Sequence, residues 1–375
     1  MDEPGRKEPH LGGNPYAYPG EAAPVIPAGA PASASSADET TYTVEFTASA
    51  GEYFRIWIVN LALTILTLGI YSAWAKVRKK RYFYGHTLID GDSFDYRANP
   101  LSILKGRIIA VVLFAAYTFG GKISPVLGGI AALVLLFAMP WLIVRSLAFN
   151  AHNSAYRNIR FNFRGAYGEP LKLIIGGGLL VIISLGIGYP YLKARLVRFA
   201  ARNHDYGTTS FELRDIVGSF YRVYLWALGL VILGFVVLGM VAGGLGAFKN
   251  MRGGFSGLFV VFMIASYAIY LLVYAYVHAH TTNVTWNALT IGPLRFESAL
   301  RGRDLAGLYL VNILAIIVTL GLATPWAVVR TMRYRAQKTT LVAAGSLADF
   351  VAAESGSVSA TGEEVGEMFD IDFGL

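Results

Sequence analysis

The chain has 375 residues, of which 55% are hydrophobic and 15% charged, and it contains no cysteine. Soluble domains carry about 25% charged residues, so this composition excludes an ordinary water-soluble domain, and the lack of cysteine excludes disulfides and thiolate chemistry. The net charge of +8 gathers at the ends of apolar segments beside Trp and Tyr, which fits anionic lipid headgroups better than nucleic acid.

The first 40 residues are rich in Pro, Gly, Ala and Ser. Such a segment buries too little apolar surface to offset chain entropy, so residues 1–40 are predicted to be a disordered N-terminal tail. Residues 41–350 are predicted to form a repeat-built membrane domain. Its apolar segments, most of which reach the ~20 residues that cross a hydrocarbon core, are 56–75, 101–121, 123–144, 173–192, 223–248, 253–277 and 305–329.

Three of these segments share one pattern when Gly69, Gly186 and Gly321 are aligned. An acid stands seventeen residues earlier, an aromatic residue five later and an arginine nine later. Weaker copies occur at 139–149 and at 274–280, where we align Tyr274 and His278 with the aromatic and basic positions. Internal repetition of this kind predicts a structure built from equivalent units.

Short β-prone stretches precede the helical segments at 42–46, 93–96, 159–163, 209–213 and 294–298. Their alternating Phe residues are typical of half-buried strands. The dipeptide Asp90-Gly91 predicts a hairpin turn. The fold class predicted from these patterns is an α-helical polytopic membrane protein with internal repeats and short cytoplasmic β-strands.

Residues 351–375 mix Ser, Gly and acidic residues. We interpret them as a disordered acidic C-terminal tail. The alternative is a short motif in which Met368, Phe369, Ile371 and Phe373 dock on a partner.

The stretches "GEYFRIWIVNLALTILTLGIYSAWAKVRKKRYFYGHTLIDGDSFDY" (51–96), "PLSILKGRIIA" (100–110) and "PWLIVRSLAFNAHNSAYRNIRFNFRGAYGEPLKL" (140–173) resemble the YjgN-like bacterial inner-membrane proteins. The resemblance covers roughly residues 42–350. It implies a multi-pass protein of the bacterial inner membrane. The family is a domain of unknown function, so the resemblance implies no catalytic residues.

The distribution of positive charge creates a conflict about topology. Residues 76–107 hold eight Lys or Arg against three Asp, which predicts a cytoplasmic loop. If segment 173–192 then crosses the membrane, the basic residues at 193–202 lie outside, against the same rule. We favour a model in which 53–80, 170–198 and 305–333 re-enter and turn at the Thr/Ser-Leu-Gly step. The alternative is seven continuous spans.

The candidate ligand or headgroup contacts combine amides inside apolar segments with aromatic–arginine pairs at their ends. An arginine four residues after Trp or Tyr lies on the same helix face, and an amide in hydrocarbon needs a partner. Helix packing and membrane anchoring are the plainer interpretations of the same residues. The candidates are Asn60, Asn312, Trp74, Arg78, Trp141, Arg145, Tyr191, Arg195, Trp326 and Arg330.

The sequence predicts no catalytic set, no metal site and no cofactor. The second apolar segment has no charged residue from position 108 onward, and the other six have none at all, which argues against an ion-coupled carrier. The first functional hypothesis is transport or binding of a small or amphiphilic ligand by a multi-pass inner-membrane protein with cytoplasmic basic loops. The alternative is a scaffold that recruits cytoplasmic partners, and the least favoured is a lipid-modifying enzyme. The predicted partners are the bilayer and its anionic headgroups, with no nucleic acid.

Overall fold

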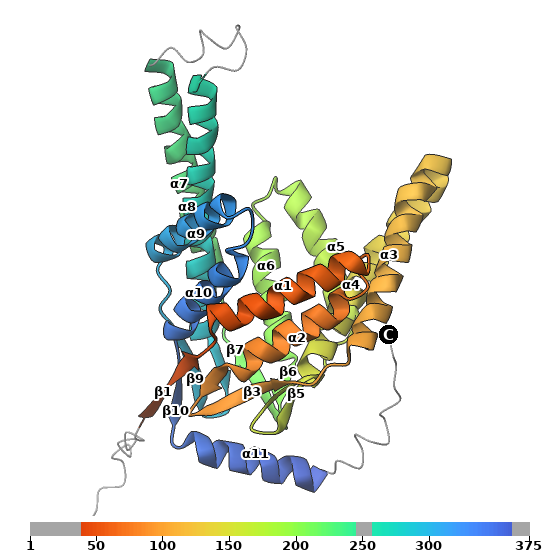
Figure 1. Cartoon of the computed structure of the whole chain (residues 1–375), viewed down its shortest axis with the longest axis vertical. Helices are drawn as coiled ribbons and strands as arrows, with labels where there is room; N and C mark the ends of the chain where they lie inside the picture. The colour runs from red at the N-terminus through yellow and green to blue at the C-terminus, as the bar shows by residue number, and fades with distance from the viewer. Residues whose placement is uncertain (1–38, 245–256, 362–375) are drawn as a thin grey trace, which may run out of the picture. The chain divides into compact units, whose positions relative to one another are not determined.

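The computed structural model describes residues 39–244 and 257–361, in which pairs of helices alternate with pairs of strands (Figure 1). The helices are α1 (Ala50–Leu66), α2 (Ser72–Gly85), α3 (Pro100–Ile123), α4 (Pro125–His152), α5 (Gly168–Ile183), α6 (Tyr189–Arg202), α7 (Val217–Gly244), α8 (Gly257–Asn287), α9 (Gly302–Val318), α10 (Thr324–Gln337) and α11 (Leu347–Thr361). The strands are β1 (Glu39–Phe46), β2 (Thr87–Ile89), β3 (Asp92–Tyr96), β4 (Ser154–Tyr156), β5 (Ile159–Phe163), β6 (His204–Tyr206), β7 (Thr209–Leu213), β8 (Leu289–Ile291), β9 (Leu294–Ser298) and β10 (Thr339–Ala344).

The strands close into one antiparallel barrel. Each strand pairs with its neighbours in the chain, and β1 completes the ring by pairing with both β2 and β10. The predicted class, an α-helical polytopic membrane protein with internal repeats and short cytoplasmic β-strands, is therefore wrong as a class. The strands are short, but they form a closed barrel, and the fold is mixed. The closed barrel could not be predicted from local sequence patterns, because a strand of three residues has almost no periodicity. The strands that close it, β1 and β10, also lie almost 300 residues apart in the chain.

Tight turns make the short strands possible. Asp90 and Gly91 form the turn between β2 and β3, with φ values of 52° and 76°. Arg157 and Asn158 form the turn between β4 and β5, with φ values of 45° and 68°. Positive φ at both central residues is the geometry that matches the twist of a two-residue hairpin. The turn predicted at Asp90-Gly91 is present.

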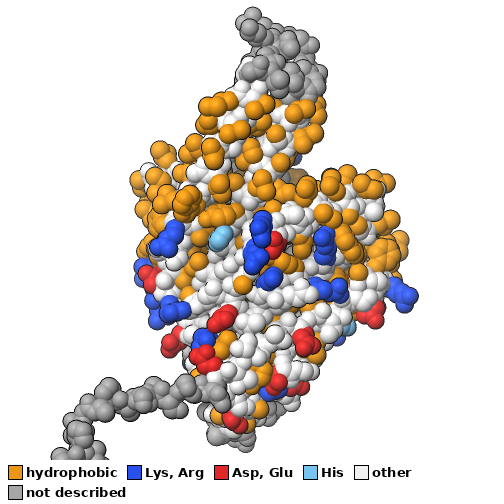
Figure 2. All heavy atoms as spheres, turned by 90° about the vertical axis from the view of Figure 1, so that its left-hand side faces the viewer, with side chains coloured by type: hydrophobic (Ala, Val, Ile, Leu, Met, Phe, Trp, Pro, Cys, Tyr) orange, Lys and Arg blue, Asp and Glu red, His pale blue; other side chains and the backbone are white. Residues whose placement is uncertain are grey.

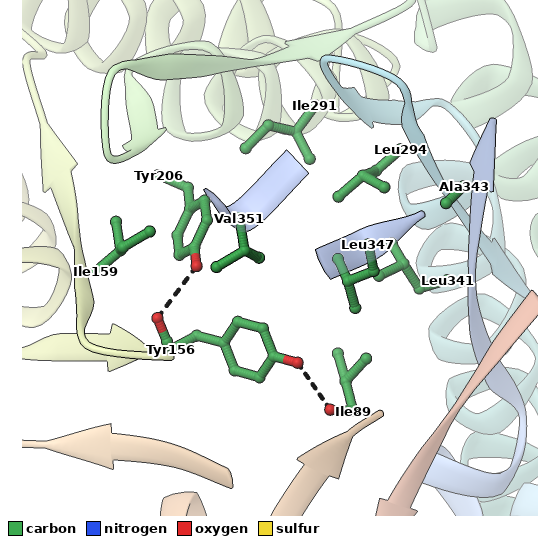
Figure 3. Close-up of a cluster of buried hydrophobic side chains, with 10 residues drawn as sticks. All are labelled: Ile89, Tyr156, Ile159, Tyr206, Ile291, Leu294, Leu341, Ala343, Leu347 and Val351. Carbon is green, nitrogen blue, oxygen red and sulfur yellow. Dashed lines mark hydrogen bonds between the residues drawn. The ribbon is translucent and has the colours of Figure 1, made fainter. Parts of the chain in front are cut away.

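A hydrophobic core fills the end of the barrel that holds the hairpin turns. Figure 3 shows Tyr156 and Tyr206 among the apolar side chains of this core. The Tyr156 hydroxyl donates to the Ile89 carbonyl at 2.7 Å, and the Tyr206 hydroxyl donates to the Tyr156 carbonyl at 3.1 Å. Burial raises the pKa of Tyr156 to about 12. Both phenols therefore stay neutral donors that link successive hairpins.

Helix α11 closes this end of the barrel. Its Leu347 and Val351 belong to the core, as Figure 3 shows. Its Glu354 is buried and accepts hydrogen bonds from the Thr208 backbone N–H at 2.7 Å and from the hydroxyls of Thr208 and Thr209. Burial alone would raise the pKa of Glu354, but these hydrogen bonds outweigh it and the pKa is lowered.

Most of α11 falls within the range that the sequence assigned to an acidic tail. Residues 351–361 are helical, whereas 362–375 and the N-terminal tail up to residue 38 lie outside the described residues. The Ser and Gly content of 354–361 obscured the helix. Only a few apolar side chains anchor it, and those have a partner only once the barrel has closed.

The helices form a ring of hairpins above the barrel. Each hairpin packs on the next along the chain, and α10 packs on α1. The helices α3, α4, α7 and α8 are long and apolar enough to cross a membrane, by length and composition. The other three hairpins are shorter. The connection between α7 and α8, at 245–256, falls outside the described residues and includes parts of the expected segments 223–248 and 253–277.

The three short hairpins turn at equivalent tripeptides, Thr-Leu-Gly or Ser-Leu-Gly, with the same backbone geometry. At Thr67-Leu68-Gly69 the leucine has φ 51° and the glycine 93°, and the corresponding values are 51° and 94° at Ser184-Leu185-Gly186 and 50° and 95° at Thr319-Leu320-Gly321. Segments 56–75, 173–192 and 305–329 are thus not single helices. They break at the step where the favoured re-entrant model places the turn.

At the tip of each short hairpin, the Thr or Ser hydroxyl forms hydrogen bonds with backbone groups that the turn leaves without a helical partner. The Thr67 hydroxyl donates to the Leu63 carbonyl at 2.7 Å and accepts from the Tyr71 N–H at 2.9 Å. Ser184 and Thr319 make the equivalent pair of bonds. The glycine N–H bonds the carbonyl five residues earlier in each tip. Unsatisfied backbone groups are expensive in hydrocarbon, so this turn suits an apolar environment.

We expect Gly186→Ala to destabilise the protein by roughly 1–2 kcal/mol, because an L residue at this positive φ is strained. Gly176→Ala in the same hairpin is the matched control. A Cβ at either position meets no atom within 4 Å, so only the backbone conformation differs. Thermal unfolding of the purified protein in detergent measures both variants. Equal stability of the two would contradict a required left-handed turn.

Candidate functional site

A pocket of about 360 Å³ occupies the end of the barrel that faces the helices. Its lining combines the last turns of α2 and α4 with the first residues of three strands and two Phe residues lower in the barrel. The lining residues are Tyr84, Thr87, Phe94, Asn150, Ala151, Ser154, Phe161 and His204. We call this the barrel-mouth pocket.

Strand alternation explains why these side chains share one face. Thr87, Ser154 and His204 stand two residues before Ile89, Tyr156 and Tyr206, which pack in the barrel core, and side chains two apart in a strand point the same way. The strand residues of the pocket therefore face the barrel interior.

Phenylalanines separate the pocket from the core below it. Phe94 and Phe161 line the pocket and also pack against the core. Phe211 and Phe296 continue the row, with ring centroids 6.4 Å apart for Phe161–Phe211 and 6.3 Å for Phe211–Phe296. The pocket thus has an apolar floor.

Hydrogen bonds organise the polar rim of the pocket. The Ser154 hydroxyl donates to the Asn150 carbonyl at 2.7 Å and lies 3.3 Å from the Tyr84 hydroxyl. The Asn150 side-chain oxygen accepts from the Lys80 ammonium and lies 3.4 Å from the Tyr96 hydroxyl. His204 Nδ1 lies 2.7 Å from the Ala200 carbonyl, which holds the imidazole ring at the rim. A polar rim over an apolar floor is the usual composition of a site for a small organic ligand.

Basic side chains extend from this rim along the seam between α2 and α3. Lys80 lies 4.5 Å from the centroid of the Tyr96 ring, and Arg107 donates to the Ser72 hydroxyl. Burial and the charge of Lys76 lower the pKa of Lys80, and burial and the charge of Arg107 lower the pKa of Lys76. Ser72, Lys76 and Lys80 stand four residues apart and so share one face of α2. Lys76, Lys80 and Arg107, which contacts Ser72, therefore lie along one seam, and we call them the α2–α3 cation cluster.

The sequence-predicted aromatic–arginine pairs lie elsewhere. The arginine carbon Cζ is 5.9 Å from the ring centroid for Arg145 over Trp141, and 5.1 Å both for Arg195 over Tyr191 and for Arg330 over Trp326. Trp74 stacks on Tyr71 at 6.1 Å, and Arg78 is exposed. The pairs stand on four helices, α2, α4, α6 and α10, so the structure does not bring them into one site. None of them lines the barrel-mouth pocket.

The two candidate amides are buried between helices. Asn312 on α9 donates to the Ala327 carbonyl at 3.3 Å and to the Thr331 hydroxyl at 3.1 Å, and its oxygen lies 3.4 Å from an Arg330 nitrogen. It therefore ties α9 to α10. Asn60 is also buried, and its side-chain oxygen has no hydrogen-bond partner among the described residues.

The structure corrects the alignment of the weaker copy at 274–280. Arg78, Arg145, Arg195 and Arg330 each stand nine residues before the following strand, which begins at 87, 154, 204 and 339. Strand β8 begins at 289, so the equivalent residue is His280, and the aromatic residue four before it is Tyr276. Their rings are 4.4 Å apart. His278 and Tyr274, the residues aligned from sequence, stand two positions too early.

The sequence analysis missed the pocket residues because none of them belongs to the aromatic–arginine pattern. The sequence did contain a spacing that indicates these residues. Sixteen residues after Arg78, Arg145 and Arg195 stand Phe94, Phe161 and Phe211, and sixteen residues after His280 stands Phe296. This spacing marks the floor of the pocket, and the residues seven positions earlier, Thr87, Ser154 and His204, mark its rim.

The family comparison matches almost the whole described region. Residues 41–368 match the family described as "Bacterial protein of unknown function (DUF898)". The chain belongs to this family. The resemblance noted from sequence is thereby confirmed.

Curated relatives in this family are named for their location. The chain is 25% identical over 359 residues to "Inner membrane protein YjgN" of Salmonella typhimurium, covering 81% of this chain and 89% of the relative. Proteins of the same name from Escherichia coli O157:H7 and K12 are 28% and 27% identical over 156 and 161 residues, each covering 39% of both chains. No solved structure matches. These names support an inner-membrane location and give no activity.

Proposed function

We propose that the barrel lies at the cytoplasmic face of the inner membrane and that its helical hairpins enter the bilayer from that side. Every helical hairpin begins and ends at a strand of the same barrel. Each hairpin must therefore leave the barrel and return to it. The basic residues at 76–81 and 193–202 then share one compartment, which removes the conflict that seven spans create with the positive-inside rule.

The hairpins differ in how far they reach. Helices α3 and α4 have 24 and 28 residues, about 36 and 42 Å at 1.5 Å per residue, enough to cross a ~30 Å hydrocarbon core. Helices α1, α5 and α9 have 17, 16 and 17 residues, about 25 Å. We propose that the hairpins α3/α4 and α7/α8 cross the membrane and the three shorter ones re-enter.

Surface composition supports this placement. The tip leucines Leu68, Leu185 and Leu320 are 96%, 93% and 94% exposed, which fits contact with lipid rather than water. Figure 2 shows hydrophobic side chains over the helices, Lys and Arg at their lower boundary, and acidic side chains over the barrel below. Such a basic belt is expected where a protein meets anionic headgroups.

We also infer that the chain is built from five equivalent units, each a helical hairpin followed by a β-hairpin. The spacing of the arginine or histidine, the first strand residue and the Phe supports four of them. In the fifth unit the strand pair is formed by β10 and β1, the last and first described strands. Val44 of β1 packs against the core together with the four Phe residues.

The function that the geometry supports best is binding of a small or amphiphilic ligand in the barrel-mouth pocket. One observation carries this proposal: the end of the barrel facing the apolar helices holds an unfilled pocket with a polar rim, whereas the opposite end is filled by the core and covered by α11. A filled barrel favours binding over transport along its axis. No feature of the described residues favours the scaffold or the enzyme.

The membrane placement predicts the labelling of single cysteines, which the cysteine-free chain makes unambiguous. Lys122→Cys, at the tip of α3/α4, is expected to react with a membrane-impermeant maleimide in intact spheroplasts. Asn162→Cys, on the outer face of β5, should react only after the membrane is opened. Leu185→Cys should resist labelling in both states because its tip lies in hydrocarbon. Labelling of Asn162→Cys from outside would contradict the placement.

The ligand proposal predicts a specific photo-crosslink. We expect p-benzoylphenylalanine in place of Phe161, inside the barrel, to capture an amphiphile when native membranes are irradiated. The same residue in place of Asn162, which is exposed on the other face of the strand, is the matched control. Mass spectrometry of the purified protein measures the adducts. No adduct at position 161, or the same adduct at both positions, would overturn the proposal.

A further inference from the structure

The three cations of the α2–α3 cluster lack acidic partners. In the ranges 39–244 and 257–361 no carboxylate lies within salt-bridge distance of Lys76, Lys80 or Arg107. Lys80 and Arg107 are half-buried. The polar groups that they do contact are the neutral Asn150 and Ser72.

Three arginines on or beside the barrel strands, by contrast, have carboxylate partners. Arg157 bonds Asp90 at 2.7 Å and also contacts Asp92, Arg164 bonds the buried Asp205 at 2.6 Å, and Arg295 pairs with Glu39. The fold therefore neutralises these three arginines and leaves the cluster beside the pocket positive.

Holding these cations together has an energetic cost. Burial disfavours the charged form of each lysine, and the neighbouring like charge adds to the effect, which is the reason that the pKa values of Lys76 and Lys80 are lowered. A bound anion would relieve both penalties, since hydrogen bonds between cations and anionic oxygens are the strong class.

We propose that Lys76, Lys80 and Arg107 bind the anionic group, a phosphate or a carboxylate, of the amphiphile that occupies the barrel-mouth pocket. This inference rests on the proposed ligand-binding function and narrows its ligand to an anionic one. The link between cluster and pocket is Asn150, which lines the pocket and accepts a hydrogen bond from Lys80. Beyond Arg107, α3 exposes Ile108, Val111 and Val112, an apolar surface suited to an acyl chain.

The test measures lysine reactivity in the purified full-length protein. Lys76 and Lys80 are acylated with a limiting reagent at pH 8, and the extent at each lysine is read by mass spectrometry. The probes are lysophosphatidylglycerol, the zwitterionic lysophosphatidylcholine, a single-chain fatty acid and inorganic phosphate. Lys193 on α6, which is exposed and stands two residues before Arg195 as Lys76 stands before Arg78, is the internal reference.

We expect lysophosphatidylglycerol or the fatty acid to protect Lys76 and Lys80 from acylation, and Lys193 much less. Lysophosphatidylcholine should protect them weakly. Protection by inorganic phosphate at comparable concentration would assign the site to free phosphate instead of a lipid headgroup. Equal protection of all three lysines would mean contact with bulk headgroups only and would overturn the proposal.

Affinity measurements on variants complete the test. Lys80→Gln and Arg107→Gln are each expected to weaken binding of the anionic amphiphile by roughly tenfold or more, and Lys193→Gln to leave it within about twofold. An unchanged affinity in the first two variants would overturn the anion site. If no amphiphile binds the wild-type protein, the ligand-binding function fails. In that case the measurement with inorganic phosphate tests the anion site independently. If phosphate does not protect Lys76 and Lys80 from acylation, the anion site is overturned as well.

Discussion

The pairing of β1 with β10 is the constraint on which the rest of the structure depends. These are the first and last described strands in chain order, and their antiparallel ladder from Glu39↔Ala344 to Thr43↔Thr340 turns a row of hairpins into a closed barrel. Closure removes the exposed edges that an open sheet of such short strands would present. It also fixes both ends of every helical hairpin at the same end of the barrel.

Several features follow from that geometry. The alternate residues of the strands meet inside the barrel, where the Phe row divides a filled core from an open pocket. The hairpin turns gather at the far end, where α11 covers them and Glu354 receives three hydrogen bonds from Thr208 and Thr209. The helices surround the pocket, so the ligand that we propose would meet the pocket and the cation cluster at one place. The placement of the helical hairpins, the pocket and the cation cluster thus follows from a single closed ladder.

The sequence predicted the local elements better than their assembly. Strands with a Phe and several residues, such as β5 and β9, were predicted, as was the turn at Asp90-Gly91, because alternation and turn chemistry are local signals. The three-residue strands β2, β4, β6, β8 and the closure were not, because their pairing depends on partners far away in the chain. The aromatic–arginine pairs were visible as a spacing, whereas the pocket depends on Asn150, Ser154 and His204, which carry no pattern by themselves and meet only in the barrel. From the sequence, the basic residues of the cation cluster were interpreted only as evidence for a cytoplasmic loop. That they lack carboxylate partners depends on which residues lie near them in the folded protein.

Closure of the barrel is tested most directly by a disulfide between its two terminal strands. Thr43 and Thr340 are opposite each other, and facing residues of antiparallel strands have Cα atoms about 4.5–5.5 Å apart, within disulfide range. The account predicts that Thr43→Cys with Thr340→Cys forms an intramolecular disulfide in native membranes under mild oxidation, seen as a mobility shift. Thr43→Cys with Glu297→Cys, one strand further and roughly 10 Å away, should form none. Failure of the first pair to form the bond, or equal bonding in both pairs, would contradict the closed barrel.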